Sequence, residues 1–155
     1  MSPVIVPVGP DHFDRLRALF DRISDDFEAR YFHPHPFTAA EAKIRSTYAG
    51  RDIYVLMLKH ETAIGYGFLR GWDANYAIPS LGIYVVAEQR GTGAARTLMD
   101  YLHAAAARRG ASRVRLKVHP DNGPARRLYE RLGYRFRPAL EDGELVGFLD
   151  LPGVL

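Results

Sequence analysis

The stretch that decides the fold runs from Ile83 to Arg109 and reads IYVVAEQRGTGAARTLMDYLHAAAARR. Residues 83–86 are β-branched or aromatic and predict a strand, and the apolar stripe over residues 98–106 predicts a helix that ends at Gly110. Between them, residues 90–95 form a turn of glycines and other small residues. The first amides of a helix have no partner within it and lie at the positive end of its dipole, so the turn predicts an anion site that fits a phosphate.

Composition sets the class of protein. With 155 residues, we expect a single domain over residues 1–155, and 47% hydrophobic and 25% charged residues are usual for a globular protein. The net charge of +3 comes from dispersed arginines, which favours an anionic ligand over nucleic acid. The absence of cysteine excludes disulfides and thiolate metal sites. No window has transmembrane length and no signal sequence is visible, so we expect a cytoplasmic protein that does not bind a membrane.

The patterns on the N-terminal side predict a strand, two helices and a hairpin. Residues 3–8 are a short apolar run, and apolar positions 13, 16, 20 and 23 share one face of a helix that opens at Asp11. Thr38 and Glu41 have the spacing of a capping box, which predicts a second helix over residues 39–49. Residues 53–59 and 63–70 are strand-like runs joined by three polar residues, an arrangement typical of a hairpin.

After the central helix the chain predicts a strand, a helix and two closing strands. The strand covers residues 113–118, residues 121–124 start the helix, and residues 134–137 and 145–151 are the closing strands. The expected fold is α/β of the α+β type, a mixed central sheet of about seven strands flanked by about four helices. Its order is β-α-α-β-β-β-α-β-α-β-β, without internal repeats.

Two segments together resemble the GNAT superfamily of acyl-CoA-dependent N-acetyltransferases. The turn from Arg90 to Ala95 matches the R-x-x-G-x-G/A pattern, with Ala95 in the last place. Residues 122–134 read NGPARRLYERLGY and resemble N-x-x-A-x-x-L-Y-x-x-x-G-F/Y. Each motif follows a predicted strand. A dinucleotide fold is disfavoured because Arg96 stands where G-x-G-x-x-G requires its third glycine.

The resemblance implies a ligand site between two parallel strands, residues 81–86 and 113–118, that splay apart. Acetyl-CoA, the acyl donor, would lie in the wedge, with its pantetheine arm against the first strand and its pyrophosphate on the amides of the turn. The cofactor-binding residues that the resemblance implies are Ile83, Tyr84, Val85, Val86, Arg90, Gly91, Thr92, Gly93, Ala94, Ala95, Asn122 and Tyr129.

Two of these residues also have a purely structural interpretation. Asn122 is a good helix N-cap in any fold, and by resemblance it would touch the cofactor arm. Tyr129 lies on an apolar helical face, where the pattern alone indicates a core tyrosine. By resemblance Tyr129 is the catalytic residue, the acid that protonates the departing CoA thiolate. An amide near Val85 would hold the oxyanion.

The base is not evident from the sequence. An amine with a pKa of about 10.4 must lose its proton before it attacks, which costs roughly 4–5 kcal/mol at neutral pH. Many relatives carry an acid on the strand before the glycine turn, but residues 80–86 contain none. The candidates are Asp73, Glu88, His33, His35 and Tyr84.

The acceptor is expected at residues 30–37, an aromatic and proline-rich segment that falls where relatives build their acceptor pocket. The candidate substrate-binding residues are Tyr31, His33, His35, Trp72 and Tyr84. His33 and His35 could suggest a metal, but no acid lies in their motif, so we expect no metal. A stiff, partly cationic lid suggests a small polar acceptor bearing a phosphate or a carboxylate.

We therefore expect acetyl transfer from acetyl-CoA to a primary amine of a small molecule by direct attack. One alternative is a protein amine as the acceptor, and another is a non-catalytic acyl-CoA-binding sensor of the same fold. Residues 134–151 could form the edge of a homodimer.

Overall fold

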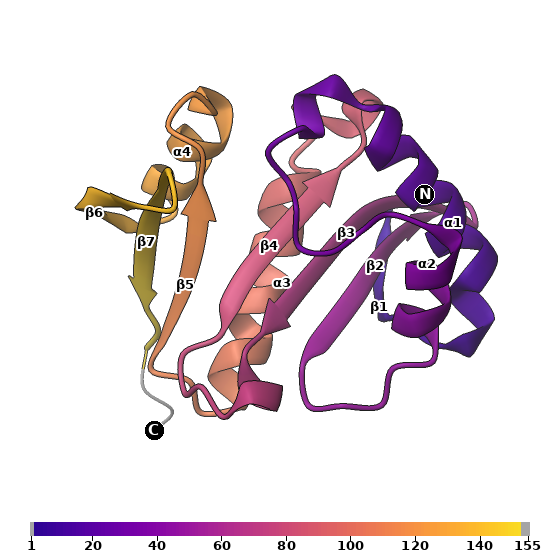
Figure 1. Ribbon diagram of the computed structural model, residues 1–155, viewed down its shortest axis with the longest axis horizontal. Helices are drawn as coiled ribbons and strands as arrows, with labels where there is room; N and C mark the ends of the chain where they lie inside the picture. Colours follow the sequence, from indigo (N-terminus) through magenta and orange to yellow (C-terminus); the bar gives the residue numbers. More distant parts are fainter. Residues whose placement is uncertain (1, 153–155) are drawn as a thin grey trace.

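The computed structural model describes residues 2–152. Seven strands form one sheet, in the order β1-β2-β3-β4-β5-β7-β6, and four α-helices pack against it in the predicted order along the chain (Figure 1). The elements are β1 Val4–Pro7, α1 Phe13–Asp25, α2 Ala39–Ser46, β2 Ile53–Lys59, β3 Thr62–Arg70, β4 Ser80–Val85, α3 Ala94–Arg108, β5 Arg113–Val118, α4 Gly123–Arg131, β6 Arg135–Glu141 and β7 Glu144–Asp150. The predicted fold class is confirmed.

The first two helices differ from prediction at one end each. Pro10 opens a 3-10 turn, Pro10–His12, so α1 begins at Phe13 rather than at Asp11. α2 begins after its predicted Thr38 cap but ends at Ser46 instead of residue 49, because Thr47 and Tyr48 already close the last turn. The buried stripe of α1 is the predicted one with Leu19 added, namely Leu16, Leu19, Phe20 and Ile23.

The helices cover both faces of the sheet. On one face, Phe20 of α1 packs edge-on against Tyr66 of β3, with 5.4 Å between the ring centroids. The next residue, Gly67, points to the opposite face, where an added Cβ would come within 3.0 Å of Leu102 and 3.3 Å of Leu98. Glycine at this position therefore allows α3 to lie close to the strand. α1 and α2 occupy the first face, and α3 and α4 the second (Figure 1).

The sheet consists of two antiparallel parts joined at one point. Strands β1 to β4 form one part, and β5, β7 and β6 form the other. Among the described residues, the parallel contact between β4 and β5 is the single pair Ser80 and Arg115, beside a 3.0 Å hydrogen bond from the Arg115 amide to the Pro79 carbonyl. Beyond this pair the two strands diverge (Figure 1). The expected parallel neighbours that splay apart are thus confirmed.

The closing hairpin is longer than predicted. β6 runs to Glu141 instead of residue 137, with a register shift between Phe136 and Leu140 that accommodates Pro138. An edge strand tolerates proline because one side of its backbone has no partner strand. Asp142 and Gly143 both have positive φ angles, 52° and 78°, which is the geometry of a tight two-residue hairpin turn.

Candidate active site

The backbone of β4 presents free polar groups where β5 turns away. Gly65 and Val85 lie opposite each other, and the Val86 amide donates to the Ile64 carbonyl at 2.9 Å. Gly65 and Val85 are therefore a non-hydrogen-bonded pair, and the amide and carbonyl of Val85 point away from β3. By the same alternation those of Ile83 do too. Of residues 83–86, Ile83 and Val85 offer their backbone to a ligand, whereas the Val86 amide is used within the sheet.

The turn before α3 is an open surface of backbone amides. None of the amides from Gly91 to Arg96 donates to a backbone acceptor within residues 2–152. Gly93, the N-cap of α3, has φ 88° and no side-chain cap, and Gly91 has φ 78°. A Cβ added to either glycine would meet no atom within 4 Å. Exposed amides at the positive end of a helix fit a phosphate group, at roughly 0.3–1 kcal/mol for each favourable charge contact.

Arg90 and Thr92 shape this turn through their side chains. The Thr92 hydroxyl donates to the Gln89 carbonyl at 2.5 Å. The Arg90 guanidinium lies 2.7 Å from Asp26 Oδ2 and 2.5 Å from Glu28 Oε2, in the segment after α1. Two carboxylates thus balance the charge of Arg90. These ion pairs connect the turn to the segment after α1.

Tyr84 belongs to the same cluster. Its hydroxyl donates to Asp26 Oδ2 at 2.7 Å. Burial opposes ionisation of Asp26, but the hydrogen bonds from Tyr84 and Arg90 outweigh it and lower the pKa of the carboxyl group. Burial and the bond to Asp26 raise the pKa of Tyr84. Sequence analysis did not identify Asp26 and Glu28, because they lie 64 and 62 residues from Arg90 and carry no motif of their own.

Tyr129 has a buried ring, and its hydroxyl makes no hydrogen bond within residues 2–152. Its side chain packs beside Tyr134, with 5.8 Å between ring centroids. Burial alone raises the pKa of Tyr129 to about 12, with no hydrogen bond contributing. The hydroxyl is not among the described buried polar atoms that lack a partner, so it reaches solvent. A buried phenol whose hydroxyl keeps only slight contact with solvent is consistent with both a proton donor and a core tyrosine.

Asn122 caps α4. Its side-chain oxygen accepts the Ala125 amide at 3.4 Å, which is the structural role expected from sequence. The side-chain NH₂ group makes no hydrogen bond within the described part of the chain. The cap therefore leaves a donor available for a ligand.

Tyr31 links the segment after α1 to the end of β5. Its ring stacks on His119, with 3.8 Å between centroids and an interplanar angle of 12°. The Arg30 guanidinium lies over the Tyr31 ring, 4.5 Å from its centroid. His119 Nδ1 accepts the Asp121 amide at 3.1 Å, so in the neutral ring Nε2 carries the proton. Sequence analysis did not identify His119, although it directly follows the predicted strand of residues 113–118.

The two histidines of the predicted lid over residues 30–37, His33 and His35, differ in exposure. His33 is exposed. The His35 side chain is only 8% exposed, its Nδ1 donates to the Pro36 carbonyl at 2.7 Å, and its Nε2 accepts the Tyr66 hydroxyl at 2.8 Å. Burial lowers the pKa of His35. A neutral ring with both nitrogens engaged favours a structural role for His35 over substrate binding or proton abstraction.

Trp72 and Asp73 lie in the connection between β3 and β4, at the other end of β4 from the glycine turn. Arg109 lies 4.8 Å over the Trp72 ring. Asp73 accepts the Tyr48 hydroxyl and the Arg51 amide, and these bonds lower its pKa. The other candidate acid, Glu88, is paired with Arg22 at 2.5 Å, which lowers its pKa as well. Neither carboxylate therefore has the raised pKa that is typical of a general base near pH 7.

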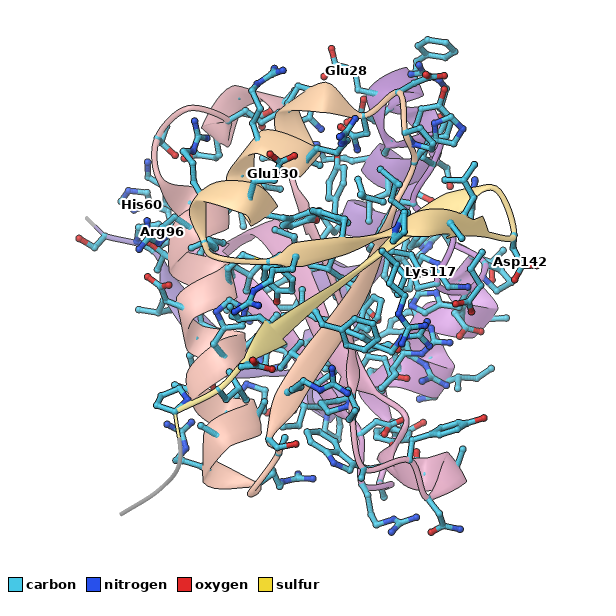
Figure 2. The ribbon with its side chains drawn as sticks, turned by 90° about the vertical axis from the view of Figure 1, so that its left-hand side faces the viewer. Glu28, His60, Arg96, Lys117, Glu130 and Asp142 are labelled. Atoms are coloured by element: carbon cyan, nitrogen blue, oxygen red, sulfur yellow. The ribbon has the colours of Figure 1, made fainter. Side chains whose placement is uncertain are left out.

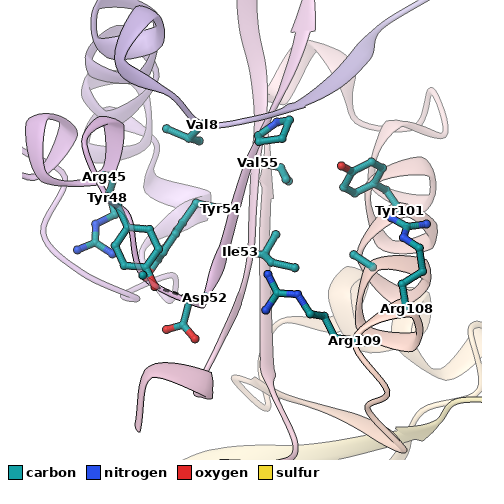
Figure 3. A pocket seen from close by; sticks show the side chains of 13 residues that line it. Val8, Arg45, Tyr48, Asp52, Ile53, Tyr54, Val55, Tyr101, Arg108 and Arg109 are labelled. Atoms are coloured by element: carbon teal, nitrogen blue, oxygen red, sulfur yellow. Dashed lines mark hydrogen bonds between the residues drawn. The ribbon is translucent and has the colours of Figure 1, made fainter. Parts of the chain in front are cut away.

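Two cavities lie away from the glycine turn. The first, about 430 Å³, surrounds the start of β2, with Arg45 and Tyr48 on one side and Tyr101, Arg108 and the C-cap of α3, Arg109, on the other (Figure 3). The second, about 760 Å³, lies on the α1 and α2 face of the sheet, around the point where β4 and β5 pair, and includes Ser80 and Arg115. The second cavity is therefore next to the wedge.

Within residues 2–152, no group of three or more His, Asp or Glu side chains is placed to hold a metal ion. No helix in the same range is long and apolar enough to cross a bilayer.

A model of the acetyltransferase (GNAT) family matches residues 16–134, which is most of the chain and includes both motifs. The chain belongs to the GNAT family. Uncharacterized N-acetyltransferases of Mycobacterium tuberculosis and Mycobacterium bovis are 39% identical over 83 residues, which is 52% of this chain and 52% of theirs. This GNAT chain thus spans about half the length of the curated relatives that it matches.

Solved GNAT structures share the fold. The GNAT domain of S. lividans PAT has a TM-score of 0.81 at 23% identity, with 96% of this chain and 90% of that chain covered. The PaiA N-acetyltransferase of Thermoplasma acidophilum, solved in complex with coenzyme A, has a TM-score of 0.78 at 14% identity, with 97% and 99% covered. At these identities the similarity establishes the architecture of a GNAT protein.

Proposed function

We propose that this chain is an N-acetyltransferase that moves the acetyl group of acetyl-CoA to a primary amine of a small molecule. The observation that carries the proposal is the wedge itself. The amides and carbonyls of Ile83 and Val85 face it, and the free amides from Gly91 to Arg96 lie at its open end. An extended arm that ends in a pyrophosphate matches a strand edge followed by a helix N-terminus.

The residues of the wedge have separate tasks in a direct transfer. The amine nitrogen attacks the thioester carbonyl carbon, the C–N bond forms, and the C–S bond then breaks. The Val85 amide is free to donate to the oxyanion of the tetrahedral intermediate. The Tyr129 hydroxyl supplies the proton that the departing thiolate takes up.

The amine proton must leave as well. Asp73 and Glu88 are held in ion pairs or hydrogen bonds, and His35 uses both ring nitrogens. We therefore assign this proton to water rather than to these three side chains. Such a site depends more on holding the reactants together than on a strong base.

The size of the adjoining cavity supports a small acceptor. About 760 Å³ falls within the range of roughly 300–1,000 Å³ that is typical of small-molecule sites. A peptide acceptor would need a long open groove instead.

The test is an assay of free thiol release from acetyl-CoA with a panel of small amines and a peptide with a free amino terminus. Mass spectrometry of each acceptor detects the added acetyl group. We expect transfer to at least one small amine. Binding of acetyl-CoA without thiol release above hydrolysis would identify a sensor, and transfer to the peptide alone would identify a protein acetyltransferase.

A further inference from the structure

A row of basic side chains crosses the face of the sheet beside the wedge. Strand register places Arg70 opposite Ser80, Ser80 opposite Arg115, and Arg115 opposite Phe148. Side chains at paired positions lie on one face, here the face that α1 and α2 cover farther along β3 and β4. These residues line the cavity of about 760 Å³, together with Arg113 and Arg137.

Two of the arginines are held in place by an aromatic ring. The guanidinium of Arg113 lies 4.7 Å from the centroid of Phe148, and that of Arg137 lies 4.5 Å from the same centroid. Neither has a carboxylate partner among the described residues. Stacking on a ring orients a guanidinium but leaves its N–H donors free for an anion.

Arg70 and Arg115 are also incompletely paired. Arg70 donates to the Pro34 carbonyl at 2.6 Å and has no carboxylate partner in the described part of the chain. Arg115 lies 3.3 Å from Glu141, but its Nε is buried and makes no hydrogen bond. Glu141 is shared with Lys117, which also reaches Asp142 of the β6–β7 turn at 3.6 Å (Figure 2).

The other acids of the cavity are occupied. Asp52 accepts the amides of Gly71 and Asp73, and Asp73 accepts the Arg51 amide and the Tyr48 hydroxyl. These bonds hold the connection between β3 and β4. Arg70, Arg113 and Arg137 therefore line one cavity without a carboxylate at ion-pair distance among the described residues, and a bound anion would lessen their mutual repulsion.

The position of this cavity relates it to the reaction. Ser80 lines it and starts β4, and Val85 lies five residues farther along the same strand, roughly 16 Å at about 3.3 Å per residue. Arginine side chains span part of this distance. An acceptor whose amine reaches the wedge would therefore place a group several atoms away among the arginines.

We propose that Arg70, Arg113 and Arg137 bind an anionic group of the acceptor, a carboxylate or a phosphate, separated from the acetylated amine by a chain of several atoms. This inference rests on the proposed function and specifies its substrate class. It places the anion-binding role on the arginines rather than on His35, which is buried and has both ring nitrogens in hydrogen bonds.

The experiment compares aminohexanoate, aminohexyl phosphate and hexylamine as acceptors, which share the amine and differ in the far group. We expect kcat/KM for at least one anionic acceptor to exceed that for hexylamine by about tenfold to a hundredfold, the usual effect of charge-assisted hydrogen bonds. The preferred arm identifies the anion as a carboxylate or a phosphate. Equal use of all three would overturn the proposal.

The variants are Arg113→Gln with Arg137→Gln, and Arg137→Gln alone, whose exposed side chain on edge strand β6 can be replaced without loss of the fold. The control matched to the single variant is Arg17→Gln, which replaces an exposed arginine of α1 and removes one positive charge elsewhere. We expect the preference for the anionic acceptor to fall in both variants and to persist in the control. A preference that persists in the double variant would contradict the role of the arginines.

Titration calorimetry in the presence of saturating coenzyme A separates this proposal from the proposed function. If no amine is acetylated, binding of aminohexanoate or aminohexyl phosphate that is lost in the double variant would still support the arginine site. Absence of binding of both anions to the unaltered protein would overturn it.

Discussion

Replacement of Tyr129 by phenylalanine separates its catalytic and structural roles. The change removes one hydroxyl that makes no hydrogen bond within the described residues and keeps the ring that packs beside Tyr134. Removal of an unpaired hydroxyl leaves no buried partner without a bond, so the free energy of unfolding should change by less than about 0.5 kcal/mol. A loss of turnover would then not arise from unfolding.

The size of the kinetic effect follows from the pKa of Tyr129. Burial raises this pKa to about 12. A thiol has a pKa of about 8.5, so complete transfer of the proton to a free thiolate is uphill by roughly 5 kcal/mol. The hydroxyl therefore contributes less than the best general acids, which give about 10²–10⁴-fold. We expect kcat to fall by about tenfold to a hundredfold, with KM for acetyl-CoA changed by less than about twofold.

The assay is steady-state thiol release, with thermal unfolding measured on the same samples. Tyr101→Phe is the matched control, because Tyr101 lines the cavity at the other end of α3. A turnover of Tyr129→Phe within twofold of the unaltered protein, at unchanged stability, would refute the role of Tyr129 as the proton donor.

Three further changes test the site. Gly93→Ala places a side chain at φ 88°, which should lower the free energy of unfolding by about 1–2 kcal/mol and the melting temperature by several degrees. Calorimetry should also show weaker coenzyme A binding. An unchanged melting temperature together with unchanged binding would contradict an open surface of amides at this turn. Asp26→Asn should lower the free energy of unfolding by about 1–3 kcal/mol at pH 7. Because the folded pKa of Asp26 is lowered, this difference is present above the unfolded pKa of about 3.9 and should shrink as the pH falls through the folded pKa, as urea titrations at several pH values would show; a constant difference would exclude the ionised cluster. His35→Ala leaves the Tyr66 hydroxyl unpaired and should destabilise the protein by about 2–3 kcal/mol without changing KM for the acceptor; a raised KM at unchanged stability would return His35 to the acceptor pocket.

Most of the fold follows from local sequence signals. The bounds of β2, β3 and β5 match the prediction within one residue. β2 and β3 are buried on both faces and have nearly continuous apolar sequences, whereas β5 alternates basic and apolar residues, and both patterns are strand signals. The N-cap Thr38 fixes the start of α2. The predicted bounds are wrong at the ends of some elements, where one or two long-range contacts determine whether the helix or strand continues. β6 extends past Pro138 because its outer edge is unpaired, which a pattern of residues does not reveal.

The site was predictable only where its parts are contiguous in sequence. The amides from Gly91 to Ala95 belong to one motif, which predicts an anion site at this turn, and the structure leaves them without backbone acceptors within residues 2–152. The ion pair between Arg90 and Asp26, by contrast, joins residues 64 positions apart, and nothing in the local sequence marks Asp26 as the partner of Arg90. The sequence around His35 predicts a substrate-binding residue. Its burial against Phe20 and Tyr66 arises from tertiary packing that the local sequence does not reveal.

Only one backbone pair, Ser80 and Arg115, joins the two units of the sheet within the described residues, so each unit can unfold locally without the other. Amide hydrogen exchange should show β5, β7, β6 and α4 opening at a lower free energy than β2 and β3, since such units unfold as cooperative blocks. A molecule that contacts both units of the sheet stabilises the folded state by mass action. At a concentration 100 times its dissociation constant, this stabilisation is about 2.7 kcal/mol. Coenzyme A should therefore slow exchange in the C-terminal unit of β5, α4, β6 and β7, including amides that it does not touch, and make this unit more resistant to proteolysis.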